Sequence, residues 1–237
     1  MSTTAKHCLV LCGAGRYADP WHDFARTSAC LAELLQDSRT AGQRLVVRVV
    51  ASDGTDWLAR LADADLLMVN TGTGLDPAAE LAEDPRWEQA FDQLGTWMDA
   101  GGAVLGCHTA VASFRDWPDW PRRLGGRWVR GVSGHPPLDE AVFRAARGAE
   151  EHPFWDGLAT SPGQAPELRV VDERYSNLEI APGVVPVLCH GEPRRPQVMG
   201  WTHGERLAYD GLGHDQRSFA TAARRRHLLN QLHWLLR

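Results

Sequence analysis

The first half of the chain alternates short apolar runs with longer stretches in which apolar residues recur every three or four positions. The short runs predict strands at residues 7–11, 45–50, 65–70 and 103–105. The longer stretches predict helices at residues 21–35, 55–61 and 85–98. Continuous apolar strands that each lead into a helix are typical of a parallel sheet covered on both faces. We therefore expect an α/β fold.

The second half is less regular between residues 115 and 195, where proline, glycine and tryptophan are frequent. Alternating apolar and polar residues predict two further strands there, at 141–144 and 168–171. The chain then returns to a regular pattern, with a strand pair at 196–201 and 206–209 and an amphipathic helix at 219–236. Because the core pattern resumes at the end, we interpret the irregular segment as an excursion from the sheet and expect a single domain over residues 1–237.

Composition narrows the class of partner. The net charge of −5 gives no footprint for nucleic acid, and the three arginines at 224–226 fall on a predicted helix, where a solvated face is expected. Five scattered cysteines without a C-x-x-C pair favour reduced thiols and a cytoplasmic protein. No segment approaches the roughly 20 apolar residues of a membrane span, and no signal sequence is evident. We expect a small-molecule partner and no membrane or nucleic acid; a homo-oligomer stays open.

The strand at 103–105 leads into a candidate reactive turn. Gly106-x-His108-x-Ala110 has the small-x-X-x-small form of a nucleophile elbow, in which small neighbours let a tight turn lift one side chain above the sheet. The side chain at the apex is His108, and we expect it to be exposed. Cys107 lies one position earlier, flanked at the matching positions by Leu105 and Thr109, so we expect it to be a buried neighbour with an ordinary or raised pKa.

Several other polar residues follow predicted strand ends. In an open parallel sheet, ligands bind at the carboxyl ends of the strands. His22, His108 and His214 each follow such an end, so we expect them to border one pocket, with Glu173 or His135 within reach across it. Four tryptophans in irregular segments could line that pocket with aromatic surface: Trp21, Trp117, Trp120 and Trp128.

A convergence of histidines also raises the question of a metal. Neutral imidazoles together with a carboxylate such as Glu173 would suit a divalent ion such as zinc. The possible histidine ligands are His22, His108, His135 and His214. Their spacing is non-local, because no H-x-x-x-H or H-E-x-x-H pattern fixes two ligands on one helix. The sequence therefore leaves the presence of a metal open.

Five motifs together resemble one known family. They are Gly13-x-Gly15-x-Tyr17 with Trp21-His22, the run at 101–110, Gly125-Gly126-Arg127-Trp128 leading to His135-Pro136, Asp172-Glu173-Arg174-Tyr175, and Leu212-Gly213-His214. In this order they are similar to the ThuA-like (trehalose utilisation) family, with Cys107 standing where an aliphatic residue is expected. The resemblance implies a three-layer, flavodoxin-like sheet of the class I glutamine amidotransferase-like type, with extra strands inserted after the elbow helix.

The resemblance also implies a role in bacterial carbohydrate metabolism. We expect acid/base chemistry on a disaccharide or oxidised sugar, not amidotransferase activity. The expected catalytic residues are His108, His214 and Glu173, and the expected substrate-binding residues are Tyr17, His22, His135 and Arg174. Two alternatives remain: a non-catalytic sugar-binding protein on a degenerate amidotransferase fold, and a cysteine hydrolase that uses Cys107.

Overall fold

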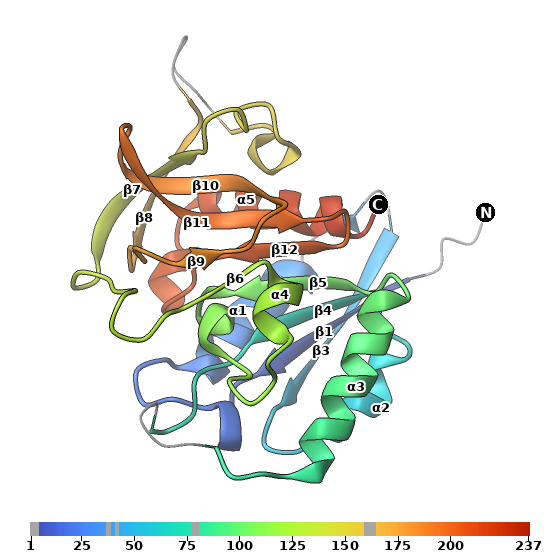
Figure 1. The fold of residues 1–237 in the computed structure, drawn as a ribbon. Helices are drawn as coiled ribbons and strands as arrows, with labels where there is room; N and C mark the ends of the chain where they lie inside the picture. The colour runs from blue at the N-terminus through green and yellow to red at the C-terminus, as the bar shows by residue number, and fades with distance from the viewer. Residues whose placement is uncertain (1–4, 37–38, 41–42, 77–80, 159–164) are drawn as a thin grey trace.

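The computed structural model describes residues 5–36, 39–40, 43–76, 81–158 and 165–237, and its centre is a ten-stranded sheet (Figure 1). One half is parallel and contains, in spatial order, β3 (Gln43–Ala51), β1 (Lys6–Cys12), β4 (Leu66–Asn70), β5 (Ala103–Cys107) and β12 (Leu207–Asp210). The antiparallel half continues with β11 (Arg195–His203), β10 (Val184–Glu192), β7 (Asp139–Ala145) and β8 (Glu167–Asp172). At the opposite edge, β2 (Arg39–Thr40) pairs antiparallel with β3.

Helices cover both faces of the sheet (Figure 1). On one face lie α1 (Phe24–Gln36) and α5 (Ala222–Leu235), and on the other α2 (Leu58–Leu61) and α3 (Pro85–Asp99). The shorter elements are α4 (Trp120–Leu124), the small sheet of β6 (Gly126–Arg127) and β9 (Glu179–Ile180), and the 3-10 turns η1 (Gly15–Tyr17), η2 (His108–Ala112), η3 (Pro153–Trp155) and η4 (Gln216–Phe219). None of the helices in the described ranges is long and apolar enough to span a lipid bilayer.

The central parallel strands are apolar because both of their faces are covered. Every residue of β4 and β5 is buried, so neither strand has a polar face that alternation could reveal. The predicted α/β fold, with a parallel central sheet and extra strands after the elbow, is confirmed. The helix predicted to follow the elbow is only the 3-10 turn η2, and β10, which no pattern predicted, lies between β11 and β7.

Strand register brings the ends of the parallel strands to one edge. Cys12 at the end of β1 pairs with Asn70 at the end of β4, and Cys107 of β5 pairs with Asp210 of β12. The segments that follow these strands therefore start side by side. Asp172 ends β8, and hydrogen bonds from Gly213 and His214 to its carboxylate connect that strand to the segment after β12.

Candidate active site

The turn after β5 has the geometry of a nucleophile elbow with a histidine at its apex. His108 adopts a positive φ of 42°, in the left-handed region that L residues rarely occupy. Gly106 permits the close packing beneath the turn, because a Cβ at this position would come within 2.7 Å of Leu124 Cδ1 and 3.2 Å of Ala110 Cβ. The sequence therefore predicted the residues that a tight turn needs here.

The His108 side chain is buried, with only 2% of the residue exposed, which corrects the expectation that it would be exposed. Its Nδ1–H donates to the carbonyl oxygen of Gly211 at 2.7 Å, and the Tyr175 hydroxyl lies 2.8 Å from Nε2. The Tyr175 ring also stacks on the imidazole, with centroids 4.6 Å apart. The loop after β12 and the segment after β8 thus cover the apex, so this elbow presents its side chain to enclosing residues instead of to solvent.

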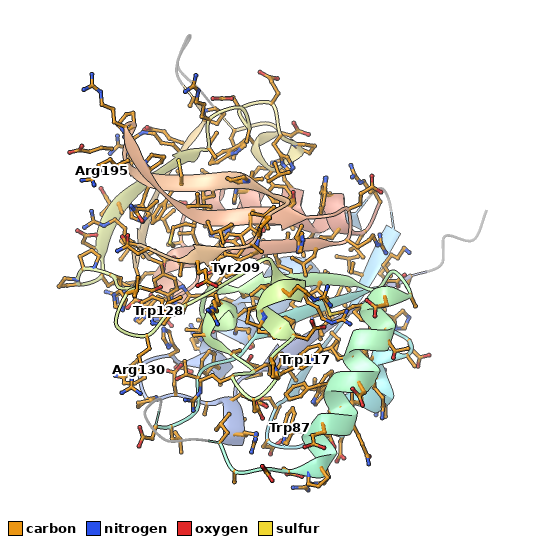
Figure 2. All side chains as sticks on the ribbon, in the orientation of Figure 1. Trp87, Trp117, Trp128, Arg130, Arg195 and Tyr209 are labelled. Atoms are coloured by element: carbon orange, nitrogen blue, oxygen red, sulfur yellow. The ribbon has the colours of Figure 1, made fainter. Side chains whose placement is uncertain are left out.

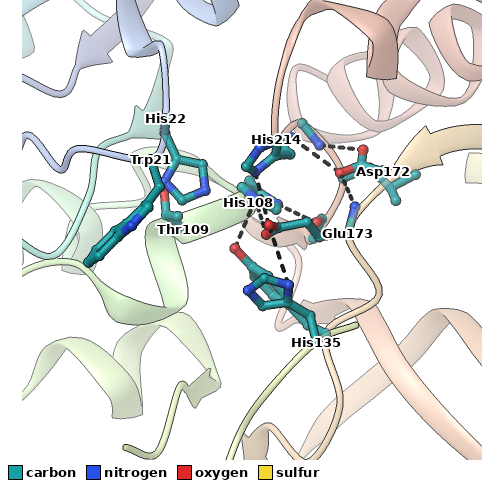
Figure 3. A network of polar contacts seen from close by, with 12 residues as sticks. Trp21, His22, His108, Thr109, His135, Asp172, Glu173 and His214 are labelled. Carbon is teal, nitrogen blue, oxygen red and sulfur yellow. Dashed lines mark hydrogen bonds and ion pairs between the residues drawn. The ribbon is translucent and has the colours of Figure 1, made fainter. Parts of the chain in front are cut away.

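Glu173 lies directly after β8 and faces three imidazoles. Its Oε2 lies 3.3 Å from His108 Nε2, and its Oε1 lies 3.3 Å from both His135 Nδ1 and His214 Nδ1 (Figure 3). Burial alone would raise the pKa of this carboxyl, but His108 and His214 outweigh that effect and hold the pKa well below its usual range. Glu173 is therefore a carboxylate at neutral pH.

The electrostatic balance differs between two of the histidines. Burial alone would lower the pKa of His108, but the Glu173 and Asp172 carboxylates outweigh it and raise that pKa above its ordinary value. Burial lowers the pKa of His22 even though Asp19 accepts a hydrogen bond from its ring. The site thus combines an imidazole that favours its proton with one that favours its neutral form.

His22 reaches the site from the turn between η1 and α1. Asp19 Oδ1 accepts hydrogen bonds from the backbone N–H groups of Trp21 and His22 and from His22 Nδ1, the last at 2.7 Å. The His22 ring lies edge-on to His214, with centroids 4.7 Å apart, and 5.1 Å from the His108 ring. The helix predicted from residue 21 begins only at Phe24, because Asp19 stabilises this turn.

Asp172 positions Glu173 and His214 together. Its fully buried carboxylate accepts hydrogen bonds from the backbone N–H groups of Glu173, Gly213 and His214 and from the Ser218 hydroxyl. Asp172 belongs to a motif noted in the sequence but was given no role from it, and Asp19 was not singled out. The signals were present: Asp19 precedes a proline in a turn, and Asp172 occupies a buried position at the end of an alternating strand.

The three histidines that follow predicted strand ends lie together at one edge of the sheet, as expected. One ligand atom from each of four residues lies within 4.8 Å of the others, and we call these residues the His–Glu cluster: His22, His108, Glu173 and His214. Imidazole nitrogens and a carboxylate oxygen are groups that could hold a divalent ion. His135 contacts Glu173 from outside this set and is 35% exposed at its side chain.

The His–Glu cluster opens into a cleft of about 1360 Å³. His22, His135, Glu173 and His214 line it, together with Tyr175, another residue that sequence analysis had not assigned to the site. Trp21 is 57% exposed at this cleft, and Trp117 and Trp128, both labelled in Figure 2, also line it. Trp120 is instead buried in the core, where its indole N–H donates to Ala110 O.

Two expected binding residues lie outside the cluster. Tyr17 is fully buried between Trp87 and Phe114, with its hydroxyl bonded to Asp116, and it does not line the cleft. Arg174 follows Glu173 but pairs with Asp139 at 2.8 Å on the surface. Successive residues of an extended segment face opposite ways, so the same backbone that directs Glu173 inward directs Arg174 away.

Cys107 has the surroundings expected of a buried neighbour. Its thiol lies 3.8 Å from Leu105 O and beside a void of about 10 Å³ that Arg224 of α5 also lines, and the residue does not line the cleft. Burial raises the pKa of the thiol. A nucleophilic cysteine needs an accessible thiolate, so this geometry gives no support to a cysteine hydrolase.

Comparison with solved structures shows the same fold in ThuA-like proteins. One from Parabacteroides merdae has 17% identity and a TM-score of 0.72, covering 98% of this chain and 90% of its own. A second, from Bacteroides uniformis, has 16% identity and a TM-score of 0.70, and the match covers 99% of this chain and 93% of the other. A glutamine amidotransferase from Methylobacillus flagellatus has 13% identity and a TM-score of 0.53, and the match covers 99% of this chain and 93% of the other.

Sequence comparison identifies the family. No curated protein matches the chain. Residues 19–235 match the family described as ThuA, trehalose utilisation, and they include all four residues of the His–Glu cluster. The matched range also contains the elbow and every strand from β2 to β12. This chain therefore belongs to the ThuA family.

Proposed function

We propose that this protein is an enzyme that acts on a small carbohydrate, with the His–Glu cluster as its reactive centre. The observation that carries the proposal is the position of Glu173, whose carboxylate lies 3.3 Å from three imidazoles in a cleft. A titratable residue in a cleft whose pKa is strongly perturbed by burial and by a specific charged partner is a candidate for a functional site. The low pKa of Glu173 and the raised pKa of His108 fit this description.

The roles of the residues follow from their access to the cleft. Glu173 and His214 line it and can exchange a proton with a sugar hydroxyl, whereas His108 lies behind Glu173 and contacts it at Nε2. His135, which is half-exposed beside Glu173, is placed to bind a substrate oxygen. In this assignment His108 sets the charge state of the site, and the groups in front of it contact the substrate.

The cleft itself favours a sugar. Its volume of about 1360 Å³ exceeds that of a typical small-ligand pocket, roughly 300–1,000 Å³. The aromatic side chains of Trp21 and Trp128 line it close to His22 and His135, and an indole face packs well against the apolar face of a sugar ring. A disaccharide or oxidised sugar therefore fits both the size and the lining, in keeping with a family described by trehalose utilisation.

The test is a panel of disaccharides, monosaccharides and their keto derivatives, with product analysis by mass spectrometry and chromatography. For a sugar that is turned over, Glu173→Gln should lower kcat by about 10²-fold or more, the usual contribution of general acid/base catalysis. Glu167→Gln is the matched control and should leave kcat unchanged, because this carboxylate lies half-buried at the other end of β8, where it pairs with Arg169. Sugar binding without any product would favour the non-catalytic alternative, and full activity in Glu173→Gln would overturn the assignment.

A further inference from the structure

The His–Glu cluster contains several buried polar atoms that make ion-pair contacts at most and no hydrogen bond within the described residues. Glu173 Oε2, His22 Nε2 and His214 Nδ1 are all buried and make no acceptable hydrogen bond to the described part of the chain. The side chain of Glu173 is only 8% exposed and that of His22 only 10%. Buried polar groups without partners are costly, so native proteins rarely keep several in one place. Because one ligand atom from each of the four residues lies within 4.8 Å of the others, a single bound group could contact them all.

The orientation of two imidazoles shows which kind of partner fits. His22 Nδ1–H donates to Asp19 Oδ1, and His108 Nδ1–H donates to Gly211 O, each at 2.7 Å. In the neutral form of each ring this leaves a lone pair on Nε2, the atom turned toward the cluster. Histidines that bind metals characteristically donate their other ring N–H to a carboxylate or a backbone carbonyl. Both arrangements are present here, because His22 donates to the carboxylate of Asp19 and His108 donates to the backbone carbonyl of Gly211.

From these observations we infer that the His–Glu cluster binds one divalent transition-metal ion of the zinc type, through one atom each of His22, His108, Glu173 and His214. Zinc binds imidazole nitrogen and carboxylate oxygen at about 2.0–2.2 Å, so tetrahedral ligand atoms lie roughly 3.3 Å apart. Glu173 Oε2 lies 3.3 Å from His108 Nε2, and Glu173 Oε1 lies 3.3 Å from His214 Nδ1, so each carboxylate oxygen stands at this distance from one imidazole nitrogen. All four ligand atoms lie within 4.8 Å of one another, so small side-chain shifts would bring them to the distances of a tetrahedral site.

The donor set also selects the class of ion. Three imidazoles and one carboxylate favour zinc and its neighbours such as cobalt and nickel, whereas magnesium and calcium prefer oxygen ligands throughout. Tyr175 adds a consequence, because its hydroxyl lies 2.8 Å from His108 Nε2, the nitrogen that the ion would occupy. An ion on that nitrogen would release the hydroxyl toward the cleft that Tyr175 already lines. When bound, the ion would supply Lewis-acid chemistry to an oxygen-rich ligand there.

The experiment measures metal binding without any sugar, so its result is independent of the proposed carbohydrate reaction. The full chain is treated with chelator and titrated with Zn²⁺ against a chromophoric competitor, and with Co²⁺ while its visible d–d absorption is recorded. We expect one ion per chain and a four-coordinate Co²⁺ spectrum. His22→Gln and His214→Gln should each weaken Zn²⁺ binding at least 100-fold. His7→Gln, which removes an imidazole from β1 outside the cluster, is the matched control and should change nothing.

A positioning variant keeps the proposal testable if a ligand variant fails to fold, which circular dichroism would reveal. Asp19→Asn retains all four ligand atoms but weakens the acceptor that orients His22, so Zn²⁺ affinity should fall by about 10–100-fold. Glu173→Gln removes the anionic ligand and should abolish the Co²⁺ spectrum. The proposal is overturned if the wild type binds Zn²⁺ no more tightly than the His22→Gln/His214→Gln double variant. It is also overturned if folded Asp19→Asn and Glu173→Gln proteins bind with wild-type affinity.

Discussion

Replacing Asp172 by asparagine should show how much the site depends on a residue that holds it in place without lining the cleft. Asp172 is fully buried and does not line the cleft, yet its two oxygens accept four hydrogen bonds from three parts of the chain. Asparagine has nearly the same shape but keeps only one acceptor oxygen, and its amide group would face N–H or O–H donors. The substitution therefore removes an acceptor without creating a cavity.

The magnitude follows from the number of bonds lost. Each carboxylate oxygen accepts two of the four hydrogen bonds, so asparagine loses two. A hydrogen bond to a charged group contributes roughly 1.5–3 kcal/mol, which gives a destabilisation of about 3–6 kcal/mol. With a urea m-value of about 3 kcal/mol/M, the unfolding midpoint should fall by about 1–2 M. Because Asp172 anchors the backbone of Glu173 and His214, ligand binding at the His–Glu cluster should weaken even where the protein remains folded.

The assay is urea unfolding followed by circular dichroism, with Zn²⁺ affinity measured on the same preparation well below the midpoint. Asp139→Asn is the matched control, because Asp139 pairs in register with Asp172 across β7 and β8 but lies on the surface with Arg174. We expect this control to change stability by no more than about 0.5 kcal/mol. A loss below about 1 kcal/mol in Asp172→Asn, or equal losses in the two variants, would refute the role assigned to Asp172.

Two further predictions concern the elbow and the helix behind it. The protein should release no ammonia from glutamine in a coupled assay, because acyl transfer needs an accessible thiolate at the apex and this apex is His108; activity lost in Cys107→Ser and kept in His108→Ala would contradict this. Burial lowers the pKa of His227 on α5 to about 3 from an ordinary value near 6.5, so the unfolded chain takes up more protons between these values. The free energy of unfolding should therefore have its full value above about pH 6.5 and fall by up to roughly 4 kcal/mol toward pH 3. In His227→Leu, the urea midpoint should depend less on pH between pH 4 and 7.

The parallel half of the fold could be predicted because its strands carry strong signals. β4, β5 and residues 8–12 of β1 are buried on both faces, and each is an almost continuous apolar run followed by a helix or turn. β10 was missed although its first six residues are apolar, because Pro186 within that run argues against a central strand. The structure accommodates this segment with register shifts on either side of Leu188 in its pairing with β11. Its conformation depends on pairing with β11 and β7, which a local pattern does not contain.

The site was predictable where it depended on topology and not where it depended on side-chain direction. Because strand ends of a parallel sheet meet, the order of strands along the chain is enough to place His22, His108 and His214 together. Tyr17 shows the limit of this argument, since its ring enters the core between aromatic neighbours while His22, five residues later, turns toward the cleft. Asp19 directs His22 through hydrogen bonds within one local turn, and residue spacing does not specify which way that turn aims the ring.

The chemistry that this elbow can present follows from the imidazole at its apex. An imidazole holds a proton or a cation, provided that its tautomer is fixed. Gly211 O fixes it by accepting the Nδ1–H of His108, and this carbonyl belongs to the segment that also brings His214 to the cluster. The left-handed backbone at His108 and the missing side chain at Gly106 keep the turn tight. With Cys107 buried below and Glu173 facing Nε2, the turn that would present a nucleophile instead provides one side of a histidine–carboxylate site.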